Sequence, residues 1–134
     1  MSTLYQTAPT AEDILNLAEA CVSRLPKHMQ EAASAVRIIV EDFAEDEILD
    51  EMQIDDPLDL SGLYSGVPLT HESVTHPSIQ TPLVFLYRLP ILFEWAARGD
   101  VTLDELVGHV LIHEYGHHFG WSDEEMHRLL DSMD

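Results

Sequence analysis

The chain has 134 residues, which is enough for one domain built around a single hydrophobic core. Its hydrophobic content of 46% is too high for a disordered chain. There are 25 acidic residues against 6 lysines and arginines, so the formal net charge is −19, which argues against nucleic acid and anionic membranes as partners.

Cysteine content and hydropathy argue against a disulfide-stabilised, secreted or membrane protein. Cys21 is the only cysteine, so the chain can form no internal disulfide and no thiolate-based zinc site. The first 20 residues lack the basic and apolar regions of a secretion signal. The longest apolar segment, "PLVFLYRLPILF", contains Arg88 and Pro90 and falls short of the roughly 18 uninterrupted apolar residues of a membrane span. We therefore expect a soluble, cytoplasmic protein.

The first half of the chain predicts two clear helices and one strand. Thr10 and Asp13 form a variant capping box before apolar residues at helical spacing, which predicts an amphipathic helix over about 11–24. A weaker helical turn is predicted over 27–33. The β-branched run "VRIIV" (36–40) predicts a strand, and "AEDEILDEM" (44–52) predicts a short acidic helix.

The second half ends in three predicted helices. Residues 55–80 are rich in turn-forming residues, so we expect loops around a short strand at "GLYSGV" (62–67). "LVFLYR" (83–88) is the strongest strand signal. Helices follow over 90–98, with Pro90 in the first turn, over about 102–119 and over about 123–132. This order predicts an α+β fold in a single domain, residues 1–134.

The predicted 102–119 helix carries the sequence "HEYGH". His113 and His117 are separated by four residues, so their imidazoles lie on one face of a helix and can share one metal ion at roughly 2.0–2.1 Å. Glu114 lies about 100° round the helix, where it can reach a metal-activated water without binding the metal. This is the H-E-x-x-H arrangement of zinc peptidases, in which the glutamate is the general base.

A catalytic zinc normally takes three protein ligands, and Asp123 is the favoured third one. Gly120 can adopt the left-handed conformation that ends a helix and turns the chain, and Asp123 follows three residues later. The full spacing is H-E-x-x-H-x-x-G-x-x-D, with aspartate where longer motifs have a third histidine. Glu124, Glu125 and His127 are alternatives. Because eleven residues follow Asp123, we do not expect a glutamate ligand on a distant helix.

The apolar residues of the same helix suggest where the metal would lie. Leu103, Leu106, Val107 and Val110 project within about 120° of the two histidines on a helical wheel. We therefore expect the metal-binding face to continue the buried face, at the edge of the core. A simpler interpretation of Asp123 is that it is the N-cap of the last helix, a role that is compatible with binding a metal.

The stretch "HEYGHHFGWSD" (113–123) resembles the small bacterial zincin-like metallopeptidases. The resemblance extends over about residues 36–132, through "VRIIVEDFAEDEILDEM", "DPLDLSGLYSGVPLTHESV" and "VFLYRLPILFEW", and is weak over the N-terminal helix. It implies a minimal zincin fold in which a small sheet packs on the long helix. It also implies zinc bound by His113, His117 and Asp123, with Glu114 catalytic.

Four further residues near the motif have structural roles as their simplest interpretation. His118 projects about 140° from His113, so we expect packing or support of the metal ligands rather than metal binding. His109 is interpreted as a partly buried helix residue that could line the cleft. His127 is expected in solvent, and Met126 in the core.

The sequence does not select a residue that stabilises the developing oxyanion. Side chains of suitable type are Tyr64, His71, His76, Tyr87, Arg88 and Tyr115. Tyr115 points about 200° away from His113 on the helix and is the least suitable.

The sequence predicts a zinc-dependent metallopeptidase that hydrolyses peptide bonds, with Zn²⁺ as cofactor and a peptide or protein as substrate. We expect the substrate to pair with an edge strand, either "LVFLYR" or "GLYSGV", and the acidic surface to favour neutral or basic peptides. The alternative is a zinc-stabilised binding module without turnover. A purely structural fold without metal is the third hypothesis. Oligomeric state is left open.

Overall fold

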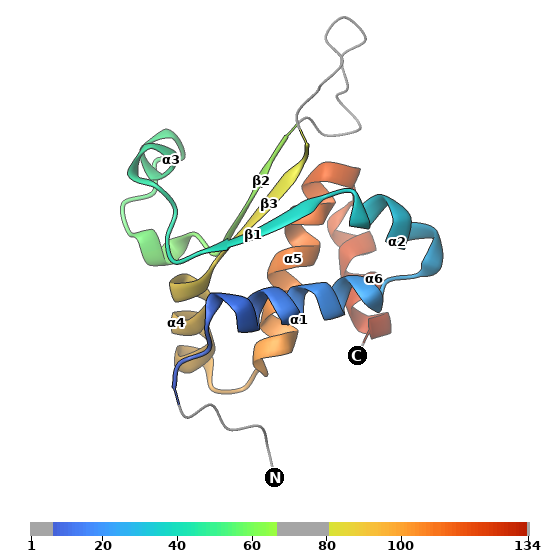
Figure 1. Ribbon diagram of the computed structural model, residues 1–134, viewed down its shortest axis with the longest axis horizontal. Coiled ribbons are helices and arrows are strands. Elements are labelled where there is room, and N and C mark those ends of the chain that lie inside the picture. Colours follow the sequence, from blue (N-terminus) through green and yellow to red (C-terminus); the bar gives the residue numbers. More distant parts are fainter. Residues whose placement is uncertain (1–6, 67–80, 134) are drawn as a thin grey trace, which may run out of the picture.

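The computed structural model describes residues 7–66 and 81–133, and Figure 1 shows helices around a small sheet. The elements are α1 (Ala11–Ser23), α2 (Lys27–Ser34), β1 (Arg37–Glu41), α3 (Asp46–Glu51), the 3-10 helix η1 (Pro57–Asp59), β2 (Gly62–Ser65), β3 (Leu83–Tyr87), α4 (Arg88–Arg98), α5 (Leu103–Phe119) and α6 (Asp123–Met133). The α+β prediction is confirmed, and the predicted boundaries agree with the observed ones to within two residues.

The helix ends follow local sequence signals. The Thr10 hydroxyl accepts from the backbone N–H of Asp13 while the Asp13 carboxylate accepts from Thr10 N–H, which completes the predicted capping box. Helix α4 begins at Arg88, so Pro90 lies in the first turn, where its missing N–H costs no hydrogen bond.

The three strands form a mixed sheet in the order β1-β3-β2. Strand β1 is parallel to β3, with Ile39 opposite Phe85, and β2 is antiparallel to β3, with Tyr64 opposite Val84. Because β3 is the central strand, "LVFLYR" cannot receive a substrate at its edge, and that half of the prediction was wrong. The β-branched and aromatic residues that made it the strongest strand signal are the residues of a strand with neighbours on both sides.

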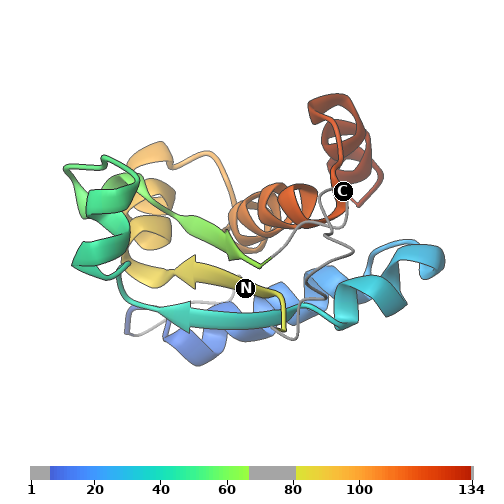
Figure 2. The ribbon, with the colours of Figure 1, turned by 90° about the horizontal axis from the view of Figure 1, so that it is seen from above.

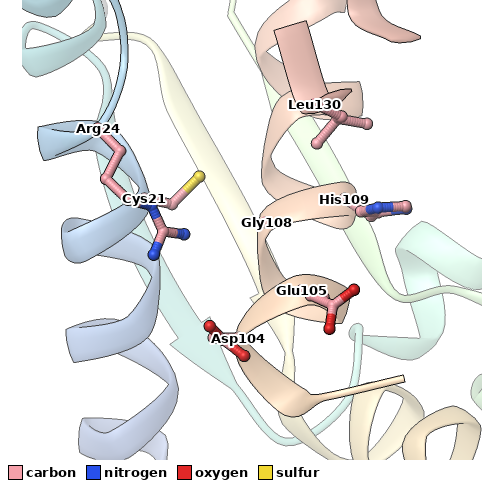
Figure 3. Close-up of a pocket in the computed structure, with 7 residues that line it drawn as sticks. All are labelled: Cys21, Arg24, Asp104, Glu105, Gly108, His109 and Leu130. Atoms are coloured by element: carbon pink, nitrogen blue, oxygen red, sulfur yellow. The ribbon is translucent and has the colours of Figure 1, made fainter. Parts of the chain in front are cut away.

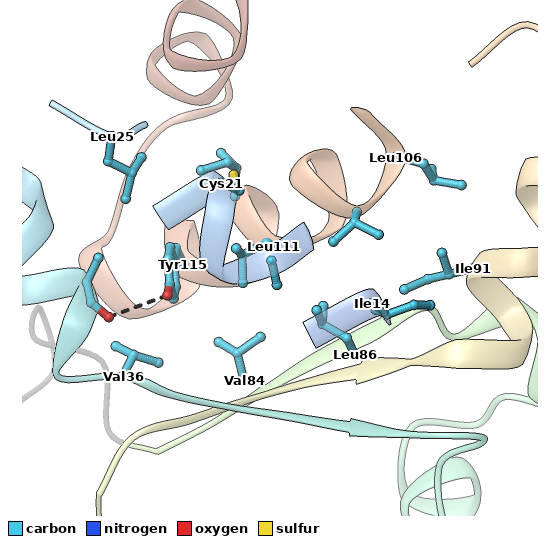
Figure 4. Packing of buried hydrophobic residues seen from close by; sticks show 14 of the residues in the cluster. Ile14, Cys21, Leu25, Val36, Val84, Leu86, Ile91, Leu106, Leu111 and Tyr115 are labelled. Atoms are coloured by element: carbon cyan, nitrogen blue, oxygen red, sulfur yellow. Dashed lines mark hydrogen bonds between the residues drawn. The ribbon is translucent and has the colours of Figure 1, made fainter. Parts of the chain in front are cut away.

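The main core lies between one face of the sheet and helices α1 and α5 (Figure 4). Ile14 and Cys21 of α1 pack with Val84 and Leu86 of β3, and Tyr115 donates a long hydrogen bond of 3.4 Å to the Ala33 carbonyl. Seen from above, β2 lies nearest α5 and β1 nearest α1 (Figure 2). A smaller cluster on the opposite face consists of Ala44, Leu49, Leu60 and Tyr87.

Within residues 7–66 and 81–133, no helix is both long and apolar enough to cross a lipid bilayer. The predicted loop region at 55–80 is described only as far as Gly66, so His71 and His76 lie outside the described residues.

Candidate functional site

Helix α5 presents the predicted metal-site residues near its C-terminal end. The Thr102 hydroxyl caps the helix by accepting from Glu105 N–H at 3.3 Å. At the other end Gly120 has φ 72°, and its N–H donates to the Gly116 carbonyl at 2.8 Å. The predicted left-handed turn at Gly120 is therefore confirmed, and it redirects the chain into α6 directly after His117.

The metal-binding face is more exposed than the sequence suggested. Leu106 is buried and Val110 half-buried, but His113 and His117, on the same side of α5, are exposed. Helices α4 and α5 are in contact, and a groove between them is lined by Leu106, Val110 and His113. The side of α5 that is buried at Leu106 is therefore exposed at His113 and His117, although all of these residues lie on one face of the helix.

Asp123 is the first residue of α6 and does not cap it. The cap is Ser122, whose hydroxyl accepts from Glu125 N–H at 3.1 Å and donates to the Glu125 carboxylate at 3.2 Å. The prediction of an N-cap at position 123 was wrong by one residue. Asp123 is exposed, and within the described part of the chain its carboxylate makes no hydrogen bond or ion pair, so both oxygens are available.

The chemistry of these donors fits zinc, although the side chains as they stand do not converge. Two imidazoles and one carboxylate, all exposed, are a ligand set that zinc accepts. In the described ranges, no three His, Cys, Asp or Glu side chains already surround a common point. The His117 Nδ1 atom instead lies 3.6 Å from Glu114 Oε1. Metal binding would require the three donors to turn toward one another across the Gly120 turn.

Strand β2 lies directly against α5 at Glu114. A Cβ atom at Gly62 would lie 2.7 Å from Val110 Cγ1 and 3.2 Å from Glu114 Cγ, so only glycine fits without a shift. Two residues along the strand, Tyr64 reaches His118, one helical turn after Glu114. The spacing of two strand residues is close to that of one helical turn, so strand and helix run side by side here.

The outer edge of β2 faces the predicted catalytic residue. Tyr87 N–H donates to the Ser61 carbonyl at 2.9 Å. Since inward and outward main-chain groups alternate along an antiparallel strand, those of Gly62 and Tyr64 point away from β3. The Tyr64 N–H accordingly faces the Glu114 carboxyl and lowers its pKa. The outward-facing main chain of β2 therefore lies beside the candidate base.

Burial raises the pKa of the Glu114 carboxyl, and His117, the Tyr64 N–H and His113 each lower it, without cancelling the effect of burial. The carboxylate is only 14% exposed. A carboxyl that holds its proton more readily than a free glutamate is suited to accepting a proton near neutral pH.

A groove of about 390 Å³ opens beside Glu114, between α4, α5 and the start of β2. His113 and Glu114 lie in its wall together with Leu106 and Val110. Its rim carries Asp59, Glu94 and Arg98, and Arg98 pairs with Glu94 at 3.3 Å. The groove is therefore lined by apolar residues, by two acidic side chains and by the candidate catalytic residue Glu114.

His109 is half-buried, as predicted, and lines this groove from α5. It also lines a second cavity of about 450 Å³ between α1, α5 and α6 (Figure 3). In that cavity Cys21 and Arg24 of α1 face Asp104 and Gly108 of α5. Among the candidate site residues, His113 and Glu114 line the groove, and none of the predicted zinc ligands lines the second cavity.

The supporting residues agree with their predicted roles. His118 is 6% exposed, and its Nδ1 is 2.8 Å from the Tyr64 hydroxyl oxygen. Burial lowers the pKa of the His118 imidazole, which favours its neutral form. Met126 is buried against Gly116, where its sulfur occupies the space of a Cβ, and His127 is exposed.

Of the described candidates for stabilising an oxyanion, Tyr64 is half-buried, and its hydroxyl lies beside His118 on α5. The Arg88 guanidinium is tied elsewhere, since its Nε donates to the Pro9 carbonyl at 2.6 Å and its Nη1 is 3.3 Å from Asp42. Tyr87 and Tyr115 are fully buried. Gly62 and the pairing of Tyr64 with α5 were not predicted, because a contact across 54 residues leaves no periodic signal in the sequence.

The comparisons with known proteins identify a family. No match was found among curated proteins. A family model described as zincin-like metallopeptidase matches residues 33–132, which include α5 and α6 but not α1. This match covers most of the chain and agrees with the α+β fold and the H-E-x-x-H helix. The chain therefore belongs to the zincin-like metallopeptidase family.

Proposed function

We propose that this protein is a zinc-dependent peptidase, with zinc held by His113, His117 and Asp123 and with Glu114 as general base. The observation that carries the proposal is the position of Glu114. Its carboxylate lies against the outward-facing main chain of β2 and opens into the groove of about 390 Å³. Family membership supports the peptidase class and zinc as its metal.

The chain's own residues divide the chemistry between them. Zinc, when bound, supplies Lewis acidity that makes water a nucleophile at neutral pH. Gly62 and Tyr64 offer main-chain groups at the edge of β2, where an extended peptide can pair as an added strand. Glu114 takes a proton from the attacking water and gives it to the leaving amine.

The substrate class follows from the charge around the groove. Asp59 and Glu94 stand at its rim, and the positive charge of Arg98 is balanced by Glu94 and by Asp100 at 3.4 Å. The chain as a whole carries a net charge of −19. Neutral and basic peptides are therefore the favoured substrates. The proposed location of the protein is the cytoplasm.

The test is cleavage of a diverse peptide library by the zinc-loaded protein and by Glu114→Gln. Wild type should cleave, and the variant should lose at least about a hundredfold in rate because the base is gone, while it retains zinc. Glu105→Gln is a control, since Glu105 is also on α5 but lies at the N-terminal cap.

A peptide-binding module without turnover is the second candidate, favoured by the free edge of β2. It predicts that wild type binds zinc and library peptides but releases no cleavage products. Equal cleavage by wild type and Glu114→Gln would contradict the assignment of the base.

A further inference from the structure

We infer that Tyr64 is a positioning residue for Glu114. Its hydroxyl is hydrogen-bonded to His118, and this bond keeps β2 in place beside Glu114. The inference rests on the proposed function, because it assigns a role to Tyr64 in aligning the proposed base. Its basis is that the Tyr64 hydroxyl contacts His118 on α5, while the strand that carries Tyr64 lies against Glu114 at Gly62 and the Tyr64 N–H lowers the pKa of the Glu114 carboxyl.

The hydroxyl contact is short and partly shielded from water. The Tyr64 oxygen lies 2.8 Å from His118 Nδ1, and the ring centroids are 5.3 Å apart. His118 is itself held, because it is 6% exposed and its ring packs edge-on against Phe119 at 4.7 Å. The His118 imidazole is therefore held in place on α5, and the Tyr64 phenol is hydrogen-bonded to it.

Gly66 leaves the space that the phenol needs. At Gly66 φ is 153°, and a Cβ there would lie 2.8 Å from the Tyr64 hydroxyl oxygen. A side chain at this position would push the phenol away from His118. The end of β2 is thus built around the Tyr64–His118 contact.

The main chain of Tyr64 transmits this anchoring to the base. Its N–H faces the outer edge of β2, the edge that lies against Glu114 at Gly62, and it lowers the pKa of the Glu114 carboxyl. The phenol and the N–H belong to one residue, so anchoring the phenol restricts how far this part of the main chain can move. Without the anchor, the end of β2 beyond Gly62 is held to α5 less firmly, and the carboxylate has more freedom to leave its place beside the substrate edge.

The test uses Tyr64→Phe, which keeps the ring and removes the hydroxyl. Tyr115→Phe is the matched control, because it removes a hydroxyl that bonds the Ala33 carbonyl in the core. We expect Tyr64→Phe to lower kcat about tenfold with KM and zinc affinity within about twofold, and Tyr115→Phe to leave all three unchanged. Amide exchange at position 64 should also become about tenfold faster in Tyr64→Phe only.

Substitutions at His118 test the same bond from the other side. His118→Asn keeps a hydrogen-bonding group near the Nδ1 position, and His118→Leu removes it. We expect Asn to retain most of kcat and Leu to match Tyr64→Phe. The double variant Tyr64→Phe/His118→Leu should be no worse than either single one, since both remove the same contact.

Two results would overturn the inference: unchanged kcat and amide exchange in Tyr64→Phe, or fully additive losses in the double variant. If wild type binds zinc and cleaves nothing, the proposed function fails, and amide exchange at position 64 still decides whether the anchor exists.

Discussion

Gly62 and Glu114 are in direct contact across the junction of β2 and α5. A Cβ at position 62 would lie 3.2 Å from Glu114 Cγ and 2.7 Å from Val110 Cγ1, with the Phe85 carbonyl oxygen 3.3 Å away on the other side. The strand is therefore enclosed between helix and sheet, and the glycine sets how closely the substrate edge approaches the base.

Gly62→Ala should destabilise the fold by about 1–3 kcal/mol, because the added methyl must push β2 away from α5. Peptidase activity should fall as well, since Glu114 loses its place beside the strand. Chemical denaturation and peptide cleavage measure the two effects.

Gly108→Ala is the control for this substitution. A Cβ at Gly108 meets only the Cys21 sulfur at 3.5 Å, an ordinary contact, and helix propensity favours alanine by about 1 kcal/mol. This variant should be as stable as wild type or more so. A stable, fully active Gly62→Ala would contradict the close approach of β2.

The Tyr87 hydroxyl is buried and has no hydrogen-bond partner among the described residues. A buried hydroxyl without a partner costs free energy, so Tyr87→Phe should raise the free energy of unfolding by roughly 1 kcal/mol. Urea denaturation of the two proteins provides the comparison. A loss of stability in Tyr87→Phe would show that the hydroxyl is bonded in solution.

Tyr87 should also make stability depend on alkaline pH. Burial, with Glu41, Glu45 and Glu114 nearby, raises the pKa of Tyr87 from 10.0 to about 12. Between these values the unfolded chain loses the phenol proton while the folded protein keeps it, so stability falls as pH rises from 10 toward 12. The decline should be shallower in Tyr87→Phe, and an equal decline in both proteins would exclude this tyrosine as its source.

Charge around the groove predicts a salt-dependent substrate preference. Peptides with lysine or arginine beside the cleaved bond should have a lower KM than otherwise identical peptides with glutamate. The difference should shrink as ionic strength rises, because exposed charges such as Asp59 are screened within about 10 Å at 0.1 M salt. Neutralising both rim acids with Asp59→Asn/Glu94→Gln should reduce the preference for basic peptides, whereas Glu47→Gln on α3 should not. Equal KM values for basic and acidic peptides at low salt would refute the proposed substrate class.

The local features of this fold could be predicted from sequence, and the contacts between distant segments could not. Helix α5 was predictable because its cap at Thr102 and its stop at Gly120 are local signals. The central position of β3 and the edge position of β2 could not be predicted, because strand order depends on packing between distant segments. The exposure of His113 was missed for the same reason, because the helical pattern does not show which neighbouring elements cover that side of α5.

The site shows the same division. The spacing of His113, Glu114, His117 and Asp123 carries the candidate chemistry in eleven consecutive residues. The partner of Glu114 is Tyr64, fifty positions earlier, and nothing in the spacing connects them. A motif therefore suggests the reaction, while the fold supplies the group that aligns it.

The zinc content of Asp123→Ala, measured beside wild type and Glu124→Ala, tests the proposed metal site most directly. Asp123 and Glu124 are both exposed acids in the first turn of α6, so each substitution changes the charge near the helix N-terminus alike. The proposed site predicts one zinc per chain in wild type and Glu124→Ala, with zinc affinity at least about tenfold weaker in Asp123→Ala. Equal zinc affinity in all three proteins, or loss of zinc from Glu124→Ala instead, would contradict Asp123 as the third ligand.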